Sequence, residues 1–166
     1  MFANDGLVNY VLVNIGILDK PYNFLTQPFA AKMVILLGLL WRWTGYNMVF
    51  FLSGLQNIEY SVYEAAKIDG ASAIQTFFKI TVPLLKPTIL LTAIMSTNGT
   101  LQLFDESINL TDGGPANASI SMSHYIYNLC FKYVPNFGYA AAMSFFILLL
   151  VAVLAFIQMR VGDKRD

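Results

Sequence analysis

The stretch YEAAKIDGASAIQTFFKITVPLLKP, residues 63–87, decides how this chain is organised. It mixes charged, polar and apolar residues at helical spacing, whereas long apolar runs precede and follow it. A chain that only crosses a bilayer has no need of such an amphipathic insert. We therefore expect this segment to lie at a membrane surface, where it is moved by something outside the bilayer.

The composition is typical of a membrane protein. The chain has 166 residues, of which 57% are hydrophobic and only 12% are charged, whereas a soluble domain carries about 25% charged residues. Its formal net charge is zero, so the sequence has no basic footprint for nucleic acid. These values favour a chain that is embedded in a lipid bilayer.

Apolar run length predicts where the chain crosses that bilayer. A helix needs about 20 residues to cross a hydrocarbon core of about 30 Å. Three stretches are long enough, and we expect spans near 33–56, 84–106 and 136–159. A shorter apolar run, interrupted by Asn9, Asn14 and Gly16, predicts an interfacial helix near 5–18. The expected fold class is all-α transmembrane, with three membrane-spanning helices.

The distribution of basic residues predicts the orientation, because cytoplasmic loops carry an excess of Lys and Arg. Basic side chains occur between the first two spans and in the C-terminal tail, at Lys67, Lys79, Lys86, Arg160, Lys164 and Arg165. The stretch from Pro87 to Phe131 instead carries no basic residue but contains Asp105, Glu106 and Asp112. The amphipathic segment and the C-terminus of this multi-pass chain are therefore expected on the cytoplasmic side.

This orientation places residues 1–32 on the outer side of the membrane. The sequence begins MFAND and has no basic region followed by an apolar run, which is not the pattern of a signal peptide. The simplest interpretation is that the chain is the C-terminal part of a longer protein and lacks its earlier helices. The alternative is a short protein whose N-terminus crosses the membrane after insertion.

The amphipathic segment carries signals for two short helices. Ser61 and Glu64 have the spacing of a capping box, which predicts a helix that begins there. Gly70 provides a residue that ends this helix in the left-handed conformation, and Ser72 or Asp69 is placed to cap the next helix. The two helices expected from these signals span residues 61–69 and 72–80.

The same residues carry a resemblance to a known family. Glu64-Ala-Ala, Gly70, Ile80 and Pro83 occur at the spacing of the EAA motif, and the segment resembles that motif of bacterial binding-protein-dependent ABC importers. Further blocks resemble the sugar-importing branch, in particular the maltose-transporter F-type half: Trp43-Thr-Gly-Tyr-Asn-Met, Gly54-Leu-Gln-Asn-Ile, Ile68-Asp-Gly-Ala-Ser, Phe104-Asp, Leu110-Thr and Gly113-Gly-Pro-Ala. The chain departs from the usual pattern at Glu59, Val82 and Glu106-Ser107.

The resemblance implies a partial type I ABC-importer permease fold. Residues 1–166 would form the C-terminal part of one transmembrane domain, with residues 59–83 as its cytoplasmic EAA loop. In this family the loop is the coupling helix that docks on a cytoplasmic ATPase dimer. The ATPase-coupling residues that the resemblance implies are Glu64, Ala65, Ala66, Asp69, Gly70 and Ala71. The alternative for the same segment is an amphipathic interfacial linker without a partner.

The resemblance also implies the rest of the assembly, located in a bacterial cytoplasmic membrane. The partners would be a second permease subunit, the ATPase dimer and an extracytoplasmic sugar-binding protein. ATP would bind to the ATPase chain, so no cofactor is expected on this one. The chain would be a transport subunit of a carbohydrate importer rather than an enzyme.

Polar residues within the first two spans suggest a substrate pathway, because polar groups at membrane depth must face protein or water. The candidates, which in the resembling family lie on helices that line the sugar pocket, are Trp43, Tyr46, Asn47, Ser96, Thr100 and Leu103. Ser96, Thr100 and Leu103 are expected on one helical face. Helix packing through small residues is the alternative for the 96–100 run. For Arg42 the alternative to a pathway role is a side chain that reaches the membrane surface.

No catalytic or metal-binding set is recognisable in the sequence. The single histidine, His124, is expected in a loop or at a helix end, and the single cysteine, Cys130, as a buried or lipid-facing residue. The Gly113-Gly-Pro run has no lysine to hold a phosphate. The second functional class is an ion-driven secondary transporter or channel subunit, but the spans contain no acidic residue near their middle for such coupling.

Overall fold

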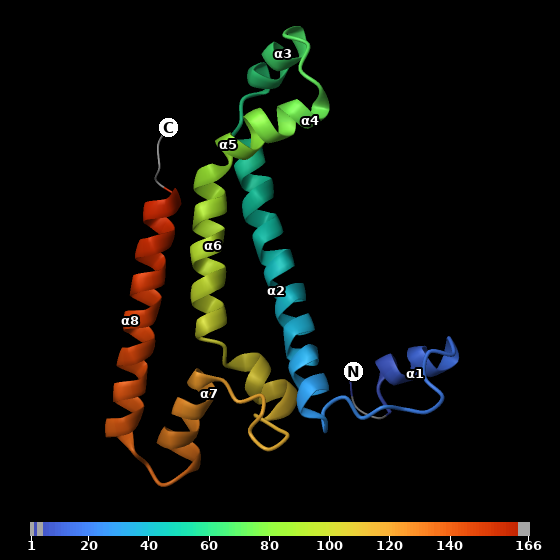
Figure 1. Ribbon diagram of the computed structural model, residues 1–166, viewed down its shortest axis with the longest axis vertical. Helices are drawn as coiled ribbons and strands as arrows, with labels where there is room; N and C mark the ends of the chain where they lie inside the picture. The colour runs from blue at the N-terminus through green and yellow to red at the C-terminus, as the bar shows by residue number, and fades with distance from the viewer. Residues whose placement is uncertain (1, 3–4, 163–166) are drawn as a thin grey trace. The chain divides into compact units, whose positions relative to one another are not determined.

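A computed structural model describes residue 2 and residues 5–162 of the chain. Within these residues the secondary structure is helical with turns, and no strand is present, which confirms the expected all-α class (Figure 1). The basic residues Lys164 and Arg165 of the predicted cytoplasmic tail lie outside the described part of the chain.

The described residues divide into two compact units. The first unit comprises the residues up to Trp41 together with Thr100–Leu149, and the second comprises Arg42–Gly99 and the residues from Leu150 onward. The longest helices contribute residues to both units. Each unit is described by itself below.

Two described helices are long and apolar enough to cross a membrane. These are α2 (Pro28–Gln56) and α8 (Phe137–Gly162), where spans near 33–56 and 136–159 were expected. Helix α2 begins five residues before the expected boundary. Proline is well suited to this first helical position, because its fixed φ matches the helix and its missing N–H would have no helical partner there.

The second expected span differs in length. Helix α6 (Lys86–Leu101) has 16 residues and ends five residues before the predicted boundary at residue 106. It qualifies as a membrane span only together with the preceding helical segment Ala73–Leu84, from which it is bent by 65°. The run 96–100, STNGT, contains no strong helix former, which is consistent with the early end of α6.

The bend lies at Leu85, and its cause is local. Leu85 has φ −83° and ψ −2°, which departs from regular helical values. Pro87 follows two residues later and has no N–H to donate to the carbonyl of Pro83, one helical turn back. The regular helical ladder is therefore interrupted where the lead-in segment meets α6.

In the first unit, α1 (Leu7–Asn14) is shorter than the interfacial helix expected at 5–18. Asn9 does not interrupt it: the side chain is buried, and its amide donates to the Tyr22 carbonyl and accepts from the Tyr22 N–H, both at 2.8 Å. Gly16, with φ +75°, reverses the chain after the helix. The same unit contains three short helical turns, η2 (Ser107–Thr111), α7 (Met122–Tyr127) and η3 (Asn128–Lys132).

In the second unit, the amphipathic segment forms a short helix and a second helical stretch, as expected (Figure 1). The first is α3 (Tyr60–Ile68). The second stretch consists of α4 (Ala73–Thr76), the π-helical turn η1 (Phe77–Thr81) and α5 (Val82–Leu84).

The two capping predictions for this segment have different outcomes. Ser72 caps α4 in a capping box with Gln75, as one of the two expected caps. The capping box of Ser61 with Glu64 is wrong. Helix α3 begins one residue earlier, after Glu59 and without a side-chain cap, so Ser61 lies inside the first turn and donates to the Glu59 carboxylate at 3.3 Å.

Close helix contacts in the second unit depend on glycine. A Cβ on Gly99 would overlap the indole ring of Trp43, and a Cβ on Gly54 would lie 2.8 Å from Thr88 Oγ1 and 2.9 Å from Leu85 Cδ2. These contacts place the C-terminal half of α2 against α6 at two levels. Small residues that let helix backbones approach are typical of packing within membranes.

Candidate functional site

The first candidate site is the turn at the end of α3. Gly70 has φ +74°, the Gly70 N–H donates to the Lys67 carbonyl at 3.2 Å, and the Ala71 N–H donates to the Ala66 carbonyl at 2.9 Å. This pair of hydrogen bonds defines a Schellman motif with glycine at its left-handed position. The turn satisfies the last carbonyls of α3 and fixes the direction in which the chain continues.

The predicted coupling residues differ in how far their side chains are exposed. Glu64, Ala65, Asp69 and Gly70 are exposed and Ala71 is half-buried. Ala66 is instead 5% exposed, because it lies on the face of α3 that is turned toward its own unit. The exposed members of this set are thus two carboxylates and two small residues, which a partner can approach closely.

Large apolar side chains surround this turn. The exposed ones are Ile68, Ile74, Phe77 and Phe78, and the two phenylalanine rings contact each other edge to face with centroids 5.0 Å apart. A cluster of exposed apolar side chains next to charged groups is typical of a surface that contacts another protein or a membrane.

The second candidate site is a group of predicted pathway residues on α2 and α6. Asn47 Nδ2 donates to Ser96 Oγ at 3.2 Å, and Ser96 Oγ lies 3.3 Å from Asn47 Oδ1. The ring of Trp43 contacts that of Tyr46 with centroids 5.5 Å apart, and Arg42 Cζ lies 5.4 Å from the centroid of Trp43. Four of the six predicted pathway residues therefore lie in one part of the second unit.

Trp43 is the member of this group with unused hydrogen-bonding capacity. Its Nε1 is buried and has no hydrogen-bond partner in the described part of the chain, although buried polar atoms are normally paired. Its indole also fills the space left by Gly99. The group therefore combines an aromatic face, an indole N–H, an amide and a hydroxyl.

The other two predicted pathway residues are placed differently. Thr100 is exposed near the end of α6, and Leu103 lies after that helix has ended at Leu101. The expectation that Ser96, Thr100 and Leu103 share one helical face is therefore wrong for Leu103, because the helix does not extend that far. Thr100 and Leu103 also belong to the first compact unit.

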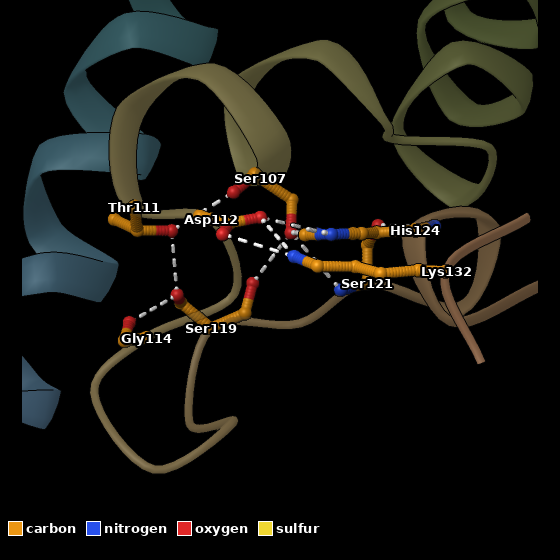
Figure 2. Close-up of polar contacts among 8 residues, drawn as sticks. All are labelled: Ser107, Thr111, Asp112, Gly114, Ser119, Ser121, His124 and Lys132. Carbon is orange, nitrogen blue, oxygen red and sulfur yellow. Dashed lines mark hydrogen bonds and ion pairs between the residues drawn. The ribbon is translucent and has the colours of Figure 1, made fainter. Parts of the chain in front are cut away.

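A third site was not predicted from the sequence. It is a polar cluster in the first unit, shown in Figure 2, and consists of Ser107, Thr111, Asp112, Gly114, Ser119, Ser121, His124 and Lys132. His124 lies in the last turn of α7, as the helix-end expectation allows, but the side chain is completely buried. A lone histidine in an apolar chain gives no signal of such burial. The signal available was the serine-rich run 119–123, which supplies two of the partners.

The hydrogen bonds of Ser107 determine the tautomer of His124. Ser107 Oγ donates to the Ser119 carbonyl at 2.8 Å and accepts from the Ser121 N–H at 3.2 Å. Its single proton is thereby used, so the 2.9 Å contact with His124 Nδ1 requires that Nδ1 carries a proton and donates. His124 Nε2 then holds a bare lone pair.

The Nε2 lone pair of His124 faces the Asp112 carboxylate but makes no hydrogen bond among the described residues. His124 Nε2 lies 3.7 Å from Asp112 Oδ1 and has no hydrogen-bond partner among the described residues. Lys132 Nζ lies 3.0 Å from both Asp112 oxygens. Burial lowers the pKa of His124 below its ordinary value of 6.5, Asp112 opposes this shift, and Lys132 adds to it. The imidazole is therefore neutral at neutral pH.

The polar cluster holds a strained turn. Asp112, Ala116 and Asn117 all have positive φ, at +46°, +50° and +61°, which is uncommon for residues other than glycine. Thr111 Oγ1 lies 2.7 Å from Ser119 Oγ, which also donates to the Gly114 carbonyl. These bonds cross the base of the turn and compensate for its backbone strain. The Gly113-Gly-Pro-Ala block of the sequence is thus a fixed structure.

Comparison with known proteins identifies the class to which these features belong. Residues 7–165 match the family described as "binding-protein-dependent transport system inner membrane component". The match covers almost the whole chain, which therefore belongs to this family of membrane transport proteins.

Two relatives of the chain are permeases named for sugar transport. The chain is 54% identical over 167 residues to the lactose transport system permease protein LacF of Rhizobium radiobacter, covering 99% of this chain and 56% of the relative. It is 36% identical over 160 residues to the trehalose/maltose transport system permease protein MalF of Thermococcus litoralis, covering 96% and 53%. These relatives are sugar ABC transporter permeases, which confirms the family resemblance.

A solved structure supports the fold. A bacterial ABC transporter involved in the import of the acidic polysaccharide alginate superposes with a TM-score of 0.80 and 26% identity, covering 95% of this chain and 54% of that one. The chain thus spans about half the length of the relatives it matches.

Proposed function

We propose that this chain forms part of the permease of an ATP-driven carbohydrate importer and is coupled to a cytoplasmic ATPase dimer through residues 59–83. The observation that carries this proposal is the geometry of α3. Its exposed face bears Glu64, Ala65 and Asp69, and the Schellman turn at Gly70 fixes the end of the helix. A short helix with a fixed direction and exposed small and acidic residues fits a cleft on a partner protein.

The physical mechanism follows from this geometry. ATP binds and is hydrolysed on the partner chains, since this sequence has no phosphate-binding loop with a lysine. Closure of the ATPase dimer displaces the docked α3. The helical stretch that follows leads directly into α6, so displacement of α3 changes the position of a helix that carries pathway residues.

The substrate class is proposed from the second site and the relatives. Trp43, Tyr46, Asn47 and Ser96 provide aromatic faces together with hydroxyl, amide and indole groups, a combination that suits a polyol. The relatives are named for lactose and for trehalose and maltose. We assign the same four residues to the translocation pathway, with Thr100 and Leu103 as further members.

The proposed topology follows the distribution of charge. Residues 59–83 and the C-terminus lie on the cytoplasmic side of a bacterial cell membrane, because the basic residues concentrate there. The polar cluster around His124 then lies on the outer side, where an extracytoplasmic sugar-binding protein docks. A second permease subunit completes the pathway.

Site-directed cross-linking tests the coupling. In a Cys130→Ser background, Ala65→Cys in the full-length permease should cross-link to the co-expressed ATPase subunit in membranes. Val134→Cys is the matched control. The Val134 side chain is 89% exposed and lies in the segment proposed to be on the outer side of the membrane. Cross-linking from Val134→Cys, or sugar uptake driven by an ion gradient without ATPase cross-links from Ala65→Cys, would contradict the proposal and favour a secondary transporter.

A further inference from the structure

Helix α3 is connected to the helical stretch that follows it through the turn at Gly70. The chain leaves α3 through the left-handed Gly70, and a Cβ placed on that residue would meet no atom within 4 Å. A cavity of about 480 Å³ lies between α3 and the π-helical turn η1, with Tyr63, Lys67, Thr76, Phe77 and Thr81 among its lining residues. Dense apolar packing therefore does not join these two elements.

A pair of hydroxyl groups spans this gap. Tyr63 Oη, on the first turn of α3, lies 3.3 Å from Thr81 Oγ1, at the end of η1. Thr81 is 7% exposed. Tyr63 is half-buried and reaches across the cavity with a rigid ring.

The direction of the hydrogen bond is determined by the partner of Thr81. Thr81 Oγ1 donates to the Thr76 carbonyl at 3.4 Å, five residues back along the π-helical turn. Because a hydroxyl has one proton, the Tyr63 hydroxyl must be the donor to Thr81. Tyr63, Thr81 and the Thr76 carbonyl thus form a chain of hydrogen bonds from α3 into the backbone of η1.

The far side of η1 is attached to the membrane helices. Thr81 is followed by α5 and by the bend at Leu85, which is 8% exposed. Leu85 and Thr88 pack against Gly54 near the end of α2. A displacement of Tyr63 therefore acts on the segment that immediately precedes α6 and not only on the Gly70 turn.

We propose that Tyr63 and Thr81 are positioning residues that transmit the displacement of α3 to α6 through their hydrogen bond, here called the Tyr63–Thr81 link. This inference rests on the proposed function, since it assumes that an ATPase moves α3. It adds that docking and transmission depend on different residues: the exposed face of α3 for docking, and the link for transmission.

The test separates these two events in the full-length permease assembled with its partner subunits in proteoliposomes. Tyr63→Phe and Thr81→Val each remove one hydroxyl and retain the shape of the side chain. The readout of motion is the maleimide reaction rate of Thr100→Cys at the exposed end of α6, in a Cys130→Ser background, with and without ATP and vanadate. The readout of docking is the amount of ATPase subunit retained in the membrane.

We expect each link variant to retain the ATPase normally while the ATP-dependent change in Thr100→Cys reactivity falls about three- to tenfold, the range that corresponds to one net hydrogen bond. The double variant should lose no more than Thr81→Val alone, because Thr81→Val already removes the hydrogen bond to Tyr63 together with the one to the Thr76 carbonyl. Thr81→Ser should restore the change. Tyr60→Phe is the control, because it removes the hydroxyl of a 74% exposed tyrosine in the same turn and should have no effect.

Three outcomes would overturn the link: an unchanged response in both single variants, a loss in the double variant beyond that of Thr81→Val, or a Thr100→Cys complex with an intact link that retains the ATPase but shows no ATP-dependent change in cysteine reactivity. Failure of the proposed function has a different signature. In that case the complex with an intact Tyr63–Thr81 link would retain no ATPase subunit, and both the proposed function and the link would be wrong.

Discussion

At the scale of single residues, Gly70 is the position where backbone conformation and proposed coupling coincide. Its φ of +74° is accessible to glycine and tolerated by asparagine, but costs a β-branched residue of the order of 1–3 kcal/mol. Space is not the constraint, because a Cβ would meet no neighbouring atom. The constraint is the left-handed conformation alone.

We therefore expect Gly70→Val to redirect the end of α3, to reduce ATPase retention in membranes about tenfold and to abolish uptake. Gly70→Asn is the matched control. It should keep most of the ATPase retention and most of the uptake, since asparagine enters the left-handed region readily. Normal retention with normal uptake in Gly70→Val would show that this turn does not present the coupling helix.

His124 is the residue with a predictable response to pH. Burial lowers its pKa in the folded protein below 6.5, so between the folded and unfolded pKa values the unfolded state binds more protons. The free energy of unfolding therefore rises with pH in this window. The contribution of His124 is complete above about pH 6.5 and is lost as the pH falls through the folded pKa.

This dependence can be measured as the apparent melting temperature of the purified permease in detergent between pH 5 and pH 8. We expect a decrease below about pH 6.5 that is reduced in His124→Asn. The asparagine amide can replace the Nδ1–H donor to Ser107 Oγ, but it does not titrate. An equal decrease in both proteins would assign the pH dependence to other groups.

At the scale of elements, the contact between α2 and α6 depends on the absence of side chains at two glycines. Gly99 lies against the Trp43 indole, where any Cβ would overlap ring atoms. A ring wedged between two helices cannot move aside as the end of a flexible side chain does. The contact is therefore intolerant of added volume.

We expect Gly99→Val to reduce stability by about 1–3 kcal/mol, as overpacking generally does, and to lower the amount of folded permease in membranes. Gly45→Ala provides the comparison on α2, because a Cβ there meets no atom within 4 Å, and alanine favours a helix over glycine. Fluorescence-detected size-exclusion chromatography after heating measures the stability and the amount of folded permease for both variants. Equal stability of the two variants would exclude close packing at Gly99.

At the scale of the whole molecule, the proposed orientation assigns the segment around Ser72 and the segment around Val134 to opposite sides of the membrane. Both residues are exposed, so cysteine at either position is accessible to a soluble reagent. In a Cys130→Ser background, a membrane-impermeant maleimide added to intact cells should label Val134→Cys. It should label Ser72→Cys only after the membrane is permeabilised. Labelling of Ser72→Cys in intact cells would reverse the topology.

Part of this structure was determined by the sequence alone. Long apolar runs predicted α2 and α8 because a helix must satisfy its own backbone in lipid. Gly70 predicted the end of α3 because glycine enters the left-handed conformation without a steric penalty. Ser72 predicted the cap of α4 because the capping box needs only residues three apart. Each of these features depends on residues close together in the chain.

The remaining features were decided by tertiary structure. The second span was predicted too long, since hydropathy does not reveal the 65° bend before α6 or its end at Leu101. The burial of His124 depends on Ser107, 17 residues away, and on a turn whose strained backbone the same bonds support. The pairing of Tyr63 with Thr81 crosses the Gly70 turn over 18 residues. Periodicity and composition describe each helix by itself, whereas these contacts arise only when the chain brings distant donors and acceptors within hydrogen-bonding distance.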